Sequence, residues 1–519
     1  MSEWSPEIEH LAQRHALAAR LGGQERVDRQ RQEGKLTVRE RIEAILDPGT
    51  FREVGSLTGK VTYGPDGSIV EYQPTNYVAG RGTIDGRPAM VGGDDFTVRG
   101  GHADASIWEK QVYGESLSEE LQIPMVRLLD GSSGGGSVMT YLEEQKTYVP
   151  PLPGFDVQAR LLELVPVCAL ALGPVVGLGA ARAVMSHFSV MVDGLSQVFV
   201  AGPPLVEYAS HEQVTKDELG GVSVHAGNGV VDNVAPSETE AFEQVRRFLS
   251  YLPQNVWELP PEVASGDDPA RRDDALLSAI PRNRRRVYDI RRIVDLVVDA
   301  GSFFEIGRRW GKSMVVGLAR LDGLPVGVMA NDPKHWGGAL TADGCEKATR
   351  FVDLCETFHL PLVSLVDNPG FAIGSAAEAA GTIRRGGTLI AALYQRTVPY
   401  FAVILRRTFG VAGAAFVDCA QPPMRVAWPS GDWGSLPLEG GIEAAYKRAL
   451  AESDDAVALR AELAEQFEAV RSPLRTAEAF GIEEVIDPRD TRQILCEWAS
   501  LAYRKLPQRL GSSRHGFRP

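Results

Sequence analysis

The chain has 519 residues, of which 44% are hydrophobic and 24% are charged, and its formal net charge is -14. These proportions are typical of a folded globular protein, whereas the acidic balance argues against a nucleic-acid binder, because phosphate binding needs a positive surface. The five cysteines form no CxxC pair and no zinc-type spacing, so neither disulfides nor a structural metal is supported.

The N-terminal part of the chain predicts helices up to about residue 46, followed by short strands between turn dipeptides such as Pro48-Gly49 and Asp85-Gly86. Residues 89–93 then predict a strand, 106–121 a helix and 125–129 a second strand. This strand, helix, strand order predicts a parallel crossover connection.

A stretch without charged residues covers positions 164–181 and approaches the length of a membrane span. Pro166 and Pro174 interrupt it, so a buried strand at 167–172, a Gly-Pro turn and the start of a helix explain it better. The first residues of the chain also lack a basic segment followed by an apolar one. We therefore expect a cytoplasmic protein with no membrane partner.

The second half of the chain repeats the order of the first, with a strand predicted at 326–330, a helix at 342–358 and a strand at 362–366. Between the halves lies a segment rich in proline and charge that lacks hydrophobic periodicity. We predict an N-terminal domain at 1–260, a linker at 261–279 and a C-terminal domain at 280–519. The basic tail after Lys505 is expected to be mobile.

The two halves also match residue by residue. A shift of 237 places Asp85-Gly86 on Asp322-Gly323 and Asp130 on Asp367. Upstream, residues 47–55 match 299–307 at a shift of 252, and downstream Gly177 matches Gly410 at a shift of 233. Ordered blocks with drifting shifts indicate a duplicated α/β domain with loop insertions, and a site built from two related halves becomes the leading hypothesis.

Glycine-rich loops after strands first suggest phosphate binding. Residues 131–137 (Gly-Ser-Ser-Gly-Gly-Gly-Ser) lack the Lys-Ser/Thr ending of a Walker loop, and no GxGxxG motif opens a strand-helix unit. A matched pair is more informative: residues 173–179 and 406–412 each follow a buried strand and precede an alanine-rich run. A strand that turns into a helix leaves unpaired N–H groups that stabilise an oxyanion. Tight strand-helix packing explains the glycines equally well.

Side chains for acid-base or nucleophilic chemistry are not evident. There is no GxSxG motif, and four histidines near glycine-rich segments have no clear carboxylate partner, so structural roles are favoured for His102, His187, His225 and His335. Arginine clusters could contact phosphates, although salt-bridged or solvated faces are the more common outcome; these clusters contain Arg282, Arg284, Arg285, Arg286, Arg384, Arg385, Arg406 and Arg407.

Taken together, several segments resemble the carboxyltransferase (beta) subunits of biotin-dependent acyl-CoA carboxylases, the propionyl-CoA and 3-methylcrotonyl-CoA carboxylase group. The resemblance covers nearly the whole chain in the same order. It is carried by residues 34–42, 46–51, 133–135, 201–206, 217–221, 346–351, 366–371 and 383–386.

This resemblance implies two tandem crotonase-like domains and an active site at which the N-terminal domain of one protomer faces the C-terminal domain of another, within a hexamer. It implies that carboxybiotin on a separate carrier releases CO2, that biotin takes the acyl α-proton, and that the CoA-thioester enolate attacks CO2. A biotin carboxylase and biotin carrier (alpha) subunit is then the required partner, because this chain lacks a Met-Lys-Met biotinylation motif.

By position, the resemblance assigns the two oxyanion holes to the amides of Gly177 and Leu178 and of Val411 and Ala412. It assigns substrate binding to Ser133, Gly134, Gly135, Gly410, Gly413 and Ala414. The family often has glycine where Leu178 stands and a polar residue near 413–416, where this chain has Gly-Ala-Ala-Phe. Small apolar residues there predict room for a bulkier acyl chain.

Three alternatives stay open. A subunit of a biotin-linked decarboxylase would use similar chemistry in reverse, and a non-catalytic scaffold would not turn over any acyl-CoA. A crotonase-like hydratase or thioesterase would need carboxylates near the oxyanion loops, and the nearest acids in sequence to Gly177 are Glu163 and Asp193.

Overall fold

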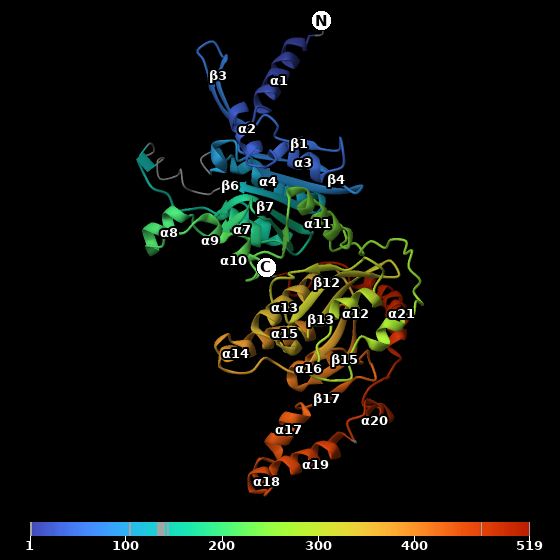
Figure 1. Cartoon of the computed structure of the whole chain (residues 1–519). Coiled ribbons are helices and arrows are strands. Elements are labelled where there is room, and N and C mark those ends of the chain that lie inside the picture. Colours follow the sequence, from blue (N-terminus) through green and yellow to red (C-terminus); the bar gives the residue numbers. More distant parts are fainter. Residues whose placement is uncertain (1–2, 103–104, 132–140, 143–144, 469, 518) are drawn as a thin grey trace. The chain divides into compact units, whose positions relative to one another are not determined.

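The computed structural model describes residues 3–102, 105–131, 141–142, 145–468, 470–517 and 519 (Figure 1). The chain forms two compact units, the first comprising Met1–Glu258 with Gly511–Pro519 and the second Leu259–Leu510. The predicted division at 1–260 and 280–519, with a linker at 261–279, stays a prediction; residues 261–279 cluster with the second unit.

The first unit begins with helices and contains one large sheet and a separate hairpin. Its strands are β1 (Arg52–Val54), β2 (Gly59–Tyr63), β3 (Ile69–Pro74), β4 (Tyr77–Ile84), β5 (Arg87–Asp94), β6 (Met125–Gly131), β7 (Val167–Val176), β8 (Phe188–Val192), β9 (Gln197–Phe199) and β10 (Asn233–Ala235). Its helices are α1 (Ser5–Ala18), α2 (Gln24–Gln32), α3 (Val38–Ile45), α4 (Trp108–Leu121), α6 (Phe155–Leu161), α7 (Leu178–Val184), α8 (Pro203–Ser210), α9 (Lys216–Gly220), α10 (Val222–His225) and α11 (Glu238–Ser250).

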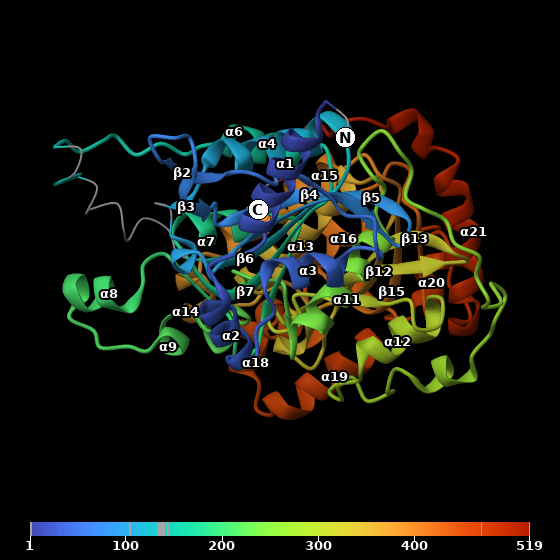
Figure 2. The same cartoon turned by 90° about the horizontal axis from the view of Figure 1, so that it is seen from above.

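The strand order of the large sheet in the first unit is β1-β4-β5-β6-β7-β8-β10, and β9 pairs with the end of β7. The strands β1, β4 and β5 are antiparallel, and pairing is parallel from β5 onward. Helix α4 connects the parallel strands β5 and β6, so the predicted crossover is confirmed. In two views, α8 extends away from the sheet of this unit (Figures 1 and 2).

The second unit repeats this plan. Its strands are β11 (Phe304–Ile306), β12 (Met314–Leu321), β13 (Leu324–Asn331), β14 (Leu362–Asn368), β15 (Tyr400–Phe409), β16 (Arg425–Ala427) and β17 (Asp432–Gly434). Its helices are α12 (Ile290–Val297), α13 (Ala342–Thr357), α14 (Ser375–Ala379), α15 (Thr382–Gln395), α16 (Gly410–Val417), α17 (Leu438–Ala445), α18 (Lys447–Glu452), α19 (Ala456–Glu468), α20 (Pro473–Glu478) and α21 (Thr491–Tyr503).

The sheet of the second unit runs β11-β12-β13-β14-β15-β16, with β17 on the end of β15, so it repeats the order and pairing of the first sheet except for β10, which has no counterpart. The predicted shifts hold in three dimensions, since β4 and β12 begin 237 residues apart and β7 and β15 begin 233 apart. The predicted duplication of an α/β domain is therefore confirmed. Helices α17 to α19 extend from this sheet around a small core of their own (Figure 1).

The principal core of the second unit lies between its sheet and the helices α12 and α21. Apolar residues on α12 recur at positions 290, 293, 294 and 297, which is the spacing of one helix face, and all four side chains are buried. They pack with β-branched residues of the central strands, such as Val328 and Val403. This core fixes the strands whose C-terminal ends carry the residues described below.

Two central strands are longer than the sequence predicts. We expect β7 to end at Leu172 and β15 at Leu405, whereas they run on to Val176 and Phe409. The extra residues pair with two short strands that come later in the chain, β9 and β17. No local sequence pattern predicts this pairing. The strands consequently turn directly into α7 and α16, without an intervening loop.

The C-terminal tail, which was expected to be mobile, makes contacts with the first unit. The Gly511 N–H donates to the carbonyl of Val256 at 2.7 Å. Phe517 is buried, with its ring centroid 4.4 Å from that of His187. An aromatic anchor thus ties the tail to the first unit.

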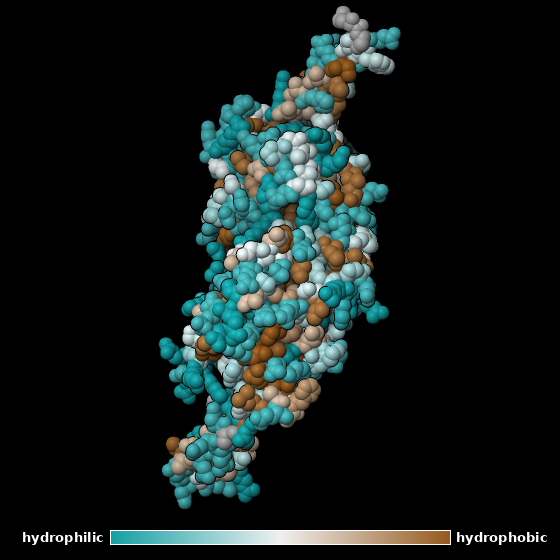
Figure 3. Space-filling view, turned by 90° about the vertical axis from the view of Figure 1, so that its right-hand side faces the viewer, coloured by the Kyte–Doolittle hydropathy of each residue, from teal (hydrophilic) through white to brown (hydrophobic). Residues whose placement is uncertain are grey.

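No helix in the described part of the chain is both long enough and apolar enough to span a membrane. All five cysteines are free and buried in this structure. On the face shown in Figure 3, hydrophilic residues predominate and apolar residues form smaller patches.

Candidate active site

The turn from β7 into α7 is the centre of the site in the first unit. Gly177 has φ +55°, a conformation that favours glycine, and its carbonyl accepts the N–H of Ala181 at 2.9 Å to close the first helical turn. The N–H groups of Leu178, Gly179 and Ala180 have no acceptor inside the helix. No side chain or loop carbonyl of the described residues accepts them either. The positive end of the helix dipole lies behind these three donors.

The N–H of Gly177 differs from these three. It donates to the carbonyl of Phe199 at 3.1 Å, because β9 lies beside the end of β7. Of the predicted pair Gly177 and Leu178, only Leu178 therefore offers an N–H group that no side chain or loop carbonyl of the described residues accepts. The donor next to Leu178 in the helix is Gly179.

A recess of ≈ 40 Å³ opens beside this helix start. It is formed by the ends of β4, β5 and β6, the start of α4 and the first turn of α7. Its lining includes Asn76, Tyr77, Asp94, Gly101, Gly131, Trp108, Gln111, Leu178, Gly179 and Arg182.

Charged groups inside the recess were not evident from the sequence. Arg182, on the second turn of α7, pairs with Asp94 at 3.6 Å and with Glu115 at 3.5 Å. Burial raises the pKa of the Asp94 carboxyl, and the nearby Arg182 opposes this shift. The buried hydroxyl of Tyr77 has no hydrogen-bond partner among the described residues. The recess is therefore lined by an ion-paired cation, a carboxyl group and the Tyr77 side chain, close to Leu178.

Asp94 was missed because it comes from β5, far from Gly177 in sequence. The nearest acids in sequence, Glu163 and Asp193, do not line the recess. The available signal was topological: the carboxyl ends of the parallel strands β5, β6 and β7 meet at one edge of a sheet.

The second unit contains the matching turn from β15 into α16. Gly410 has φ +61° and stands at the first helical position. The N–H groups of Val411 and Ala412 have no acceptor in the helix, and no side chain or loop carbonyl of the described residues accepts them. The side chain of Val411 is 66% exposed, whereas Ala412 is buried. Val411 matches Leu178 at the shift of 233.

The remaining predicted binding residues have different surroundings. Gly413 is buried, and a Cβ there would lie 2.6 Å from the Thr408 hydroxyl oxygen, so tight strand-helix packing accounts for this glycine. Ala414 is exposed on the same helix. The predicted residues Ser133, Gly134 and Gly135 lie outside the described part of the chain.

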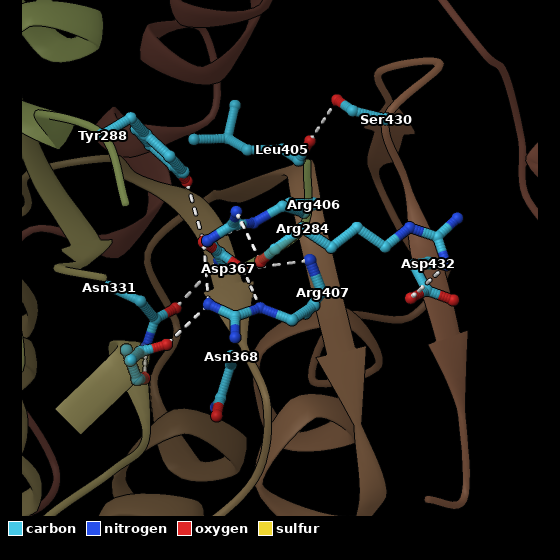
Figure 4. A network of polar contacts seen from close by, with 12 residues as sticks. Arg284, Tyr288, Asn331, Asp367, Asn368, Leu405, Arg406, Arg407, Ser430 and Asp432 are labelled. Carbon is cyan, nitrogen blue, oxygen red and sulfur yellow. Dashed lines mark hydrogen bonds and ion pairs between the residues drawn. The ribbon is translucent and has the colours of Figure 1, made fainter. Parts of the chain in front are cut away.

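A buried carboxylate holds in place the part of β15 that leads into α16 (Figure 4). Asp367, at the end of β14, accepts hydrogen bonds from Arg406 Nε at 3.1 Å, Arg407 Nε at 2.7 Å and the Tyr288 hydroxyl at 2.9 Å. Arg407 also donates to the carbonyl of Gly337. Burial opposes ionisation of Asp367, but hydrogen bonds and charge from Arg407 and Arg406 outweigh it and lower its pKa.

In the first unit, the matching buried carboxylate pairs with different cations. Asp130 matches Asp367, and its partners are Lys35 at 2.7 Å and Arg41 at 2.8 Å, both from the N-terminal helical region. Gly173 stands where the second unit has Arg406. Asp130 and its partners occupy the space that a side chain at position 173 would need.

We expect Gly173→Ala to destabilise the first unit. The added Cβ would lie 1.9 Å from Asp130 Oδ1 and 2.7 Å from Lys35 Nζ, so a buried ion pair must move. A loss of about 3 kcal/mol is expected, because a displaced buried charge loses its partner. Thermal unfolding measures this loss. Gly227→Ala is the matched control, since a Cβ at Gly227 meets nothing within 4 Å; equal Tm values for the two variants would contradict this account.

A second duplicated network is complete in only one unit. In the second unit, Arg291 pairs with Asp332 at 2.7 Å and also with Glu305. In the first unit, the matching Arg39 pairs with Glu53 at 2.9 Å, while Oδ2 of Asp95 has no hydrogen-bond partner among the described residues. Burial raises the pKa of Asp95 to about 6, although hydrogen bonds from Thr97 act to lower it.

We expect Asp95→Asn to stabilise the protein at neutral pH. The pKa of the Asp95 carboxyl is near 4 in the unfolded chain and about 6 in the folded protein. Its contribution to the stability of the fold is therefore complete below pH 4 and is lost as the pH rises to about 6. Asparagine resembles the protonated acid, so the variant should gain about 2 kcal/mol at pH 8. Unfolding at several pH values measures the gain, which should shrink toward pH 5. A gain that does not depend on pH would contradict the explanation.

Two of the four histidines named from the sequence, His187 and His225, bond backbone groups. His187 Nδ1 accepts the N–H of Val167 at 3.0 Å, and its Nε2 lies 3.0 Å from the carbonyl of Leu162. His225 Nε2 lies 2.6 Å from the carbonyl of Val198. These rings brace strands and carry no free nitrogen into the recess.

Residues 29–516 match the carboxyl transferase domain family. The chain belongs to this family. It is 34% identical over 497 residues to the propionyl-CoA carboxylase carboxyltransferase subunit of Haloferax mediterranei, with 94% of each chain covered. It is 33% identical over 496 residues to the propionyl-CoA carboxylase beta chain of Roseobacter denitrificans, again with 94% of each covered.

Solved structures agree with the carboxyl transferase assignment. The chain matches transcarboxylase 12S, solved as a hexamer with hydrolyzed methylmalonyl-coenzyme A bound, with a TM-score of 0.86, 30% identity and 100% of both chains covered. The predicted fold class, two tandem crotonase-like α/β domains, is confirmed by this likeness and by the repeated sheets. Membership of the carboxyltransferase subunits of biotin-dependent acyl-CoA carboxylases is likewise confirmed.

Proposed function

We propose that this carboxyl transferase moves a carboxyl group between biotin on a separate carrier subunit and an acyl-CoA. The observation that carries the proposal is the duplicated turn in which a buried strand enters a helix and leaves free N–H groups, at Leu178 and at Val411. Such donors stabilise an oxyanion while allowing many different side chains.

The two units are proposed to hold different oxyanions. The Leu178 and Gly179 amides would bind the thioester oxygen of the acyl-CoA, and the Val411 and Ala412 amides the ureido oxygen of biotin. The recess beside Leu178 and the unpaired amides at Val411 fit these groups, since each ligand presents one carbonyl oxygen that gains negative charge. Biotin, when bound, supplies the carboxyl group and the base, which accounts for the lack of an evident catalytic base in the sequence.

The partner and the assembly belong to the same proposal. A biotin carboxylase and biotin carrier subunit would deliver the carboxylated cofactor, and a hexamer would bring the acyl-CoA side of one protomer to the biotin side of another. Exposed apolar side chains on α8, with Leu205 at 59% and Tyr208 at 83% exposure, support contact with another protein. We propose a cytoplasmic location for this complex.

The acyl group is proposed to extend beyond propionyl. Ala414 is small and exposed on the first turns of α16, so the helix offers no polar side chain at this position to a longer chain. A panel of acetyl-, propionyl-, methylcrotonyl- and long-chain acyl-CoAs, assayed with the carrier subunit, tests both the activity and this preference. Turnover limited to acetyl- and propionyl-CoA would contradict the preference, and no turnover with any acyl-CoA would favour the scaffold.

The same assay separates carboxylation from decarboxylation. We expect incorporation of labelled bicarbonate into acyl-CoA in the presence of ATP and the partner subunit. Activity found only with a carboxylated acyl-CoA and a membrane decarboxylase would instead indicate the decarboxylase alternative.

A further inference from the structure

A cavity in the second unit does not involve the proposed oxyanion donors. Its volume is ≈ 530 Å³, which falls within the usual range of small-molecule sites, about 300–1,000 Å³. One wall is apolar and contains Leu276, Leu277 and Ile280 together with several prolines. Charged residues make up much of the rest of the lining. We call this space the arginine cavity.

Arginine dominates the charge around the arginine cavity. Four arginines line it, Arg282, Arg284, Arg406 and Arg471, against a single acidic residue, Glu468. Behind the lining, Asp367 pairs with Arg406, and Asp432 pairs with Arg471 and lies 3.7 Å from Arg284, so these carboxylates offset much of that charge. The excess positive charge rests mainly on Arg282, in a chain whose formal charge is -14. A positive cavity in an acidic protein favours an anionic ligand held locally.

The ion pairs of these arginines leave capacity for a ligand. Arg284 is 3.3 Å from Glu468, whose side chain is 58% exposed and can turn into solvent. Arg471 keeps the buried Asp432 as a second partner, with Nε 2.8 Å from Oδ1. Arg282 is exposed and has no ion pair among the described residues. An anion would therefore gain contacts without stranding a buried carboxylate.

The walls of the arginine cavity are held by buried hydrogen bonds. Arg406 is 3% exposed and donates to the backbone carbonyls of Arg284 and Arg286, at 3.3 and 3.0 Å. On the other side, the Ser430 hydroxyl donates to the carbonyl of Leu405 at 2.6 Å. Figure 4 shows Arg284, Arg406 and Ser430 around this network. The loop that carries the basic side chains is thus anchored, which reduces the entropy lost on binding.

We propose that the arginine cavity binds a phosphorylated organic anion of nucleotide size. The planar guanidinium of arginine matches phosphate oxygens in pairs, so Arg282, Arg284 and Arg471 would hold the phosphates. The apolar wall would receive the organic part of the ligand. Inorganic phosphate alone would leave that wall uncovered.

Calorimetric titration of the full-length chain at low ionic strength, with ADP, pyrophosphate and adenosine, tests this proposal. We expect saturable binding of ADP, weaker binding of pyrophosphate and no measurable binding of adenosine. Arg282→Gln should weaken ADP binding by at least about fivefold, because one charge-assisted contact is lost. Its exposed position and lack of an ion pair leave the fold intact, which an unchanged Tm would verify.

Arg292→Gln is the matched control, since Arg292 is an exposed arginine on α12 that does not line the arginine cavity. Competition by acetyl-CoA in the wild type would identify the ligand as the nucleotide part of coenzyme A, and its absence would indicate a free nucleotide. No saturable ADP binding, or equal binding by wild type and Arg282→Gln, would overturn the proposal. So would equal weakening by Arg292→Gln. None of these readouts depends on carboxyl transfer.

Discussion

Leu178→Pro is expected to lower kcat for acyl-CoA carboxylation by about 100- to 1,000-fold, which is the usual effect of losing one oxyanion donor. Proline removes the N–H group but is tolerated at the first helical position, where that N–H has no acceptor in the helix. The preceding residue is Gly177, which has no Cβ to meet the proline ring. Steady-state kinetics with the carrier subunit measures the effect.

The control for this prediction is Leu178→Ala, which keeps the N–H group and removes the side chain. It should retain nearly the wild-type kcat. Val411→Pro should reproduce the loss in the second unit, again with a glycine, Gly410, before the substituted position. Equal activity of Leu178→Pro and Leu178→Ala would show that the amide is not a catalytic donor.

Asp367→Ala is expected to destabilise the second unit by about 3–5 kcal/mol, because it leaves the buried Arg406 and the half-buried Arg407 without their carboxylate. For a unit of this size the loss corresponds to a fall in Tm of roughly 10 °C. Differential scanning calorimetry would measure it. Since the pKa of Asp367 is lowered by its partners, the stability it contributes should be present above pH 4 and lost below it.

Asp274→Ala is the matched control in the same unit. Asp274 is 85% exposed and pairs with Arg489 at 3.0 Å, and exposed ion pairs contribute little to stability. A Tm for Asp367→Ala within error of that control would mean that the carboxylate does not hold the two arginines as the structure indicates.

The duplicated framework was predictable because local signals specify it. Asp85-Gly86 and Asp322-Gly323 form the turns between β4 and β5 and between β12 and β13. All four residues have positive φ angles, between 50° and 80°. Aspartate and glycine favour this conformation in tight hairpins. Such turns, and the buried strands beside them, can be recognised without knowledge of the rest of the fold.

The donors and the charged groups of the site could not be predicted in the same way. That the Gly177 N–H is bonded to Phe199 depends on the pairing of β7 with β9, which is set by tertiary structure. Asp94 reaches the recess only because β5 and β7 end at the same sheet edge. Asp130 and Asp367 match in sequence, yet their cations come from different elements. Each of these contacts joins residues that are distant in the chain.

A crystal structure of the chain with an acyl-CoA thioester bound tests the central claim most directly. The thioester oxygen should lie about 2.7–3.1 Å from the Leu178 nitrogen, with the Gly177 N–H still bonded to Phe199. A thioester oxygen bound away from the start of α7, or a Leu178 N–H bonded to a protein acceptor, would contradict the claim that this helix start stabilises the developing negative charge.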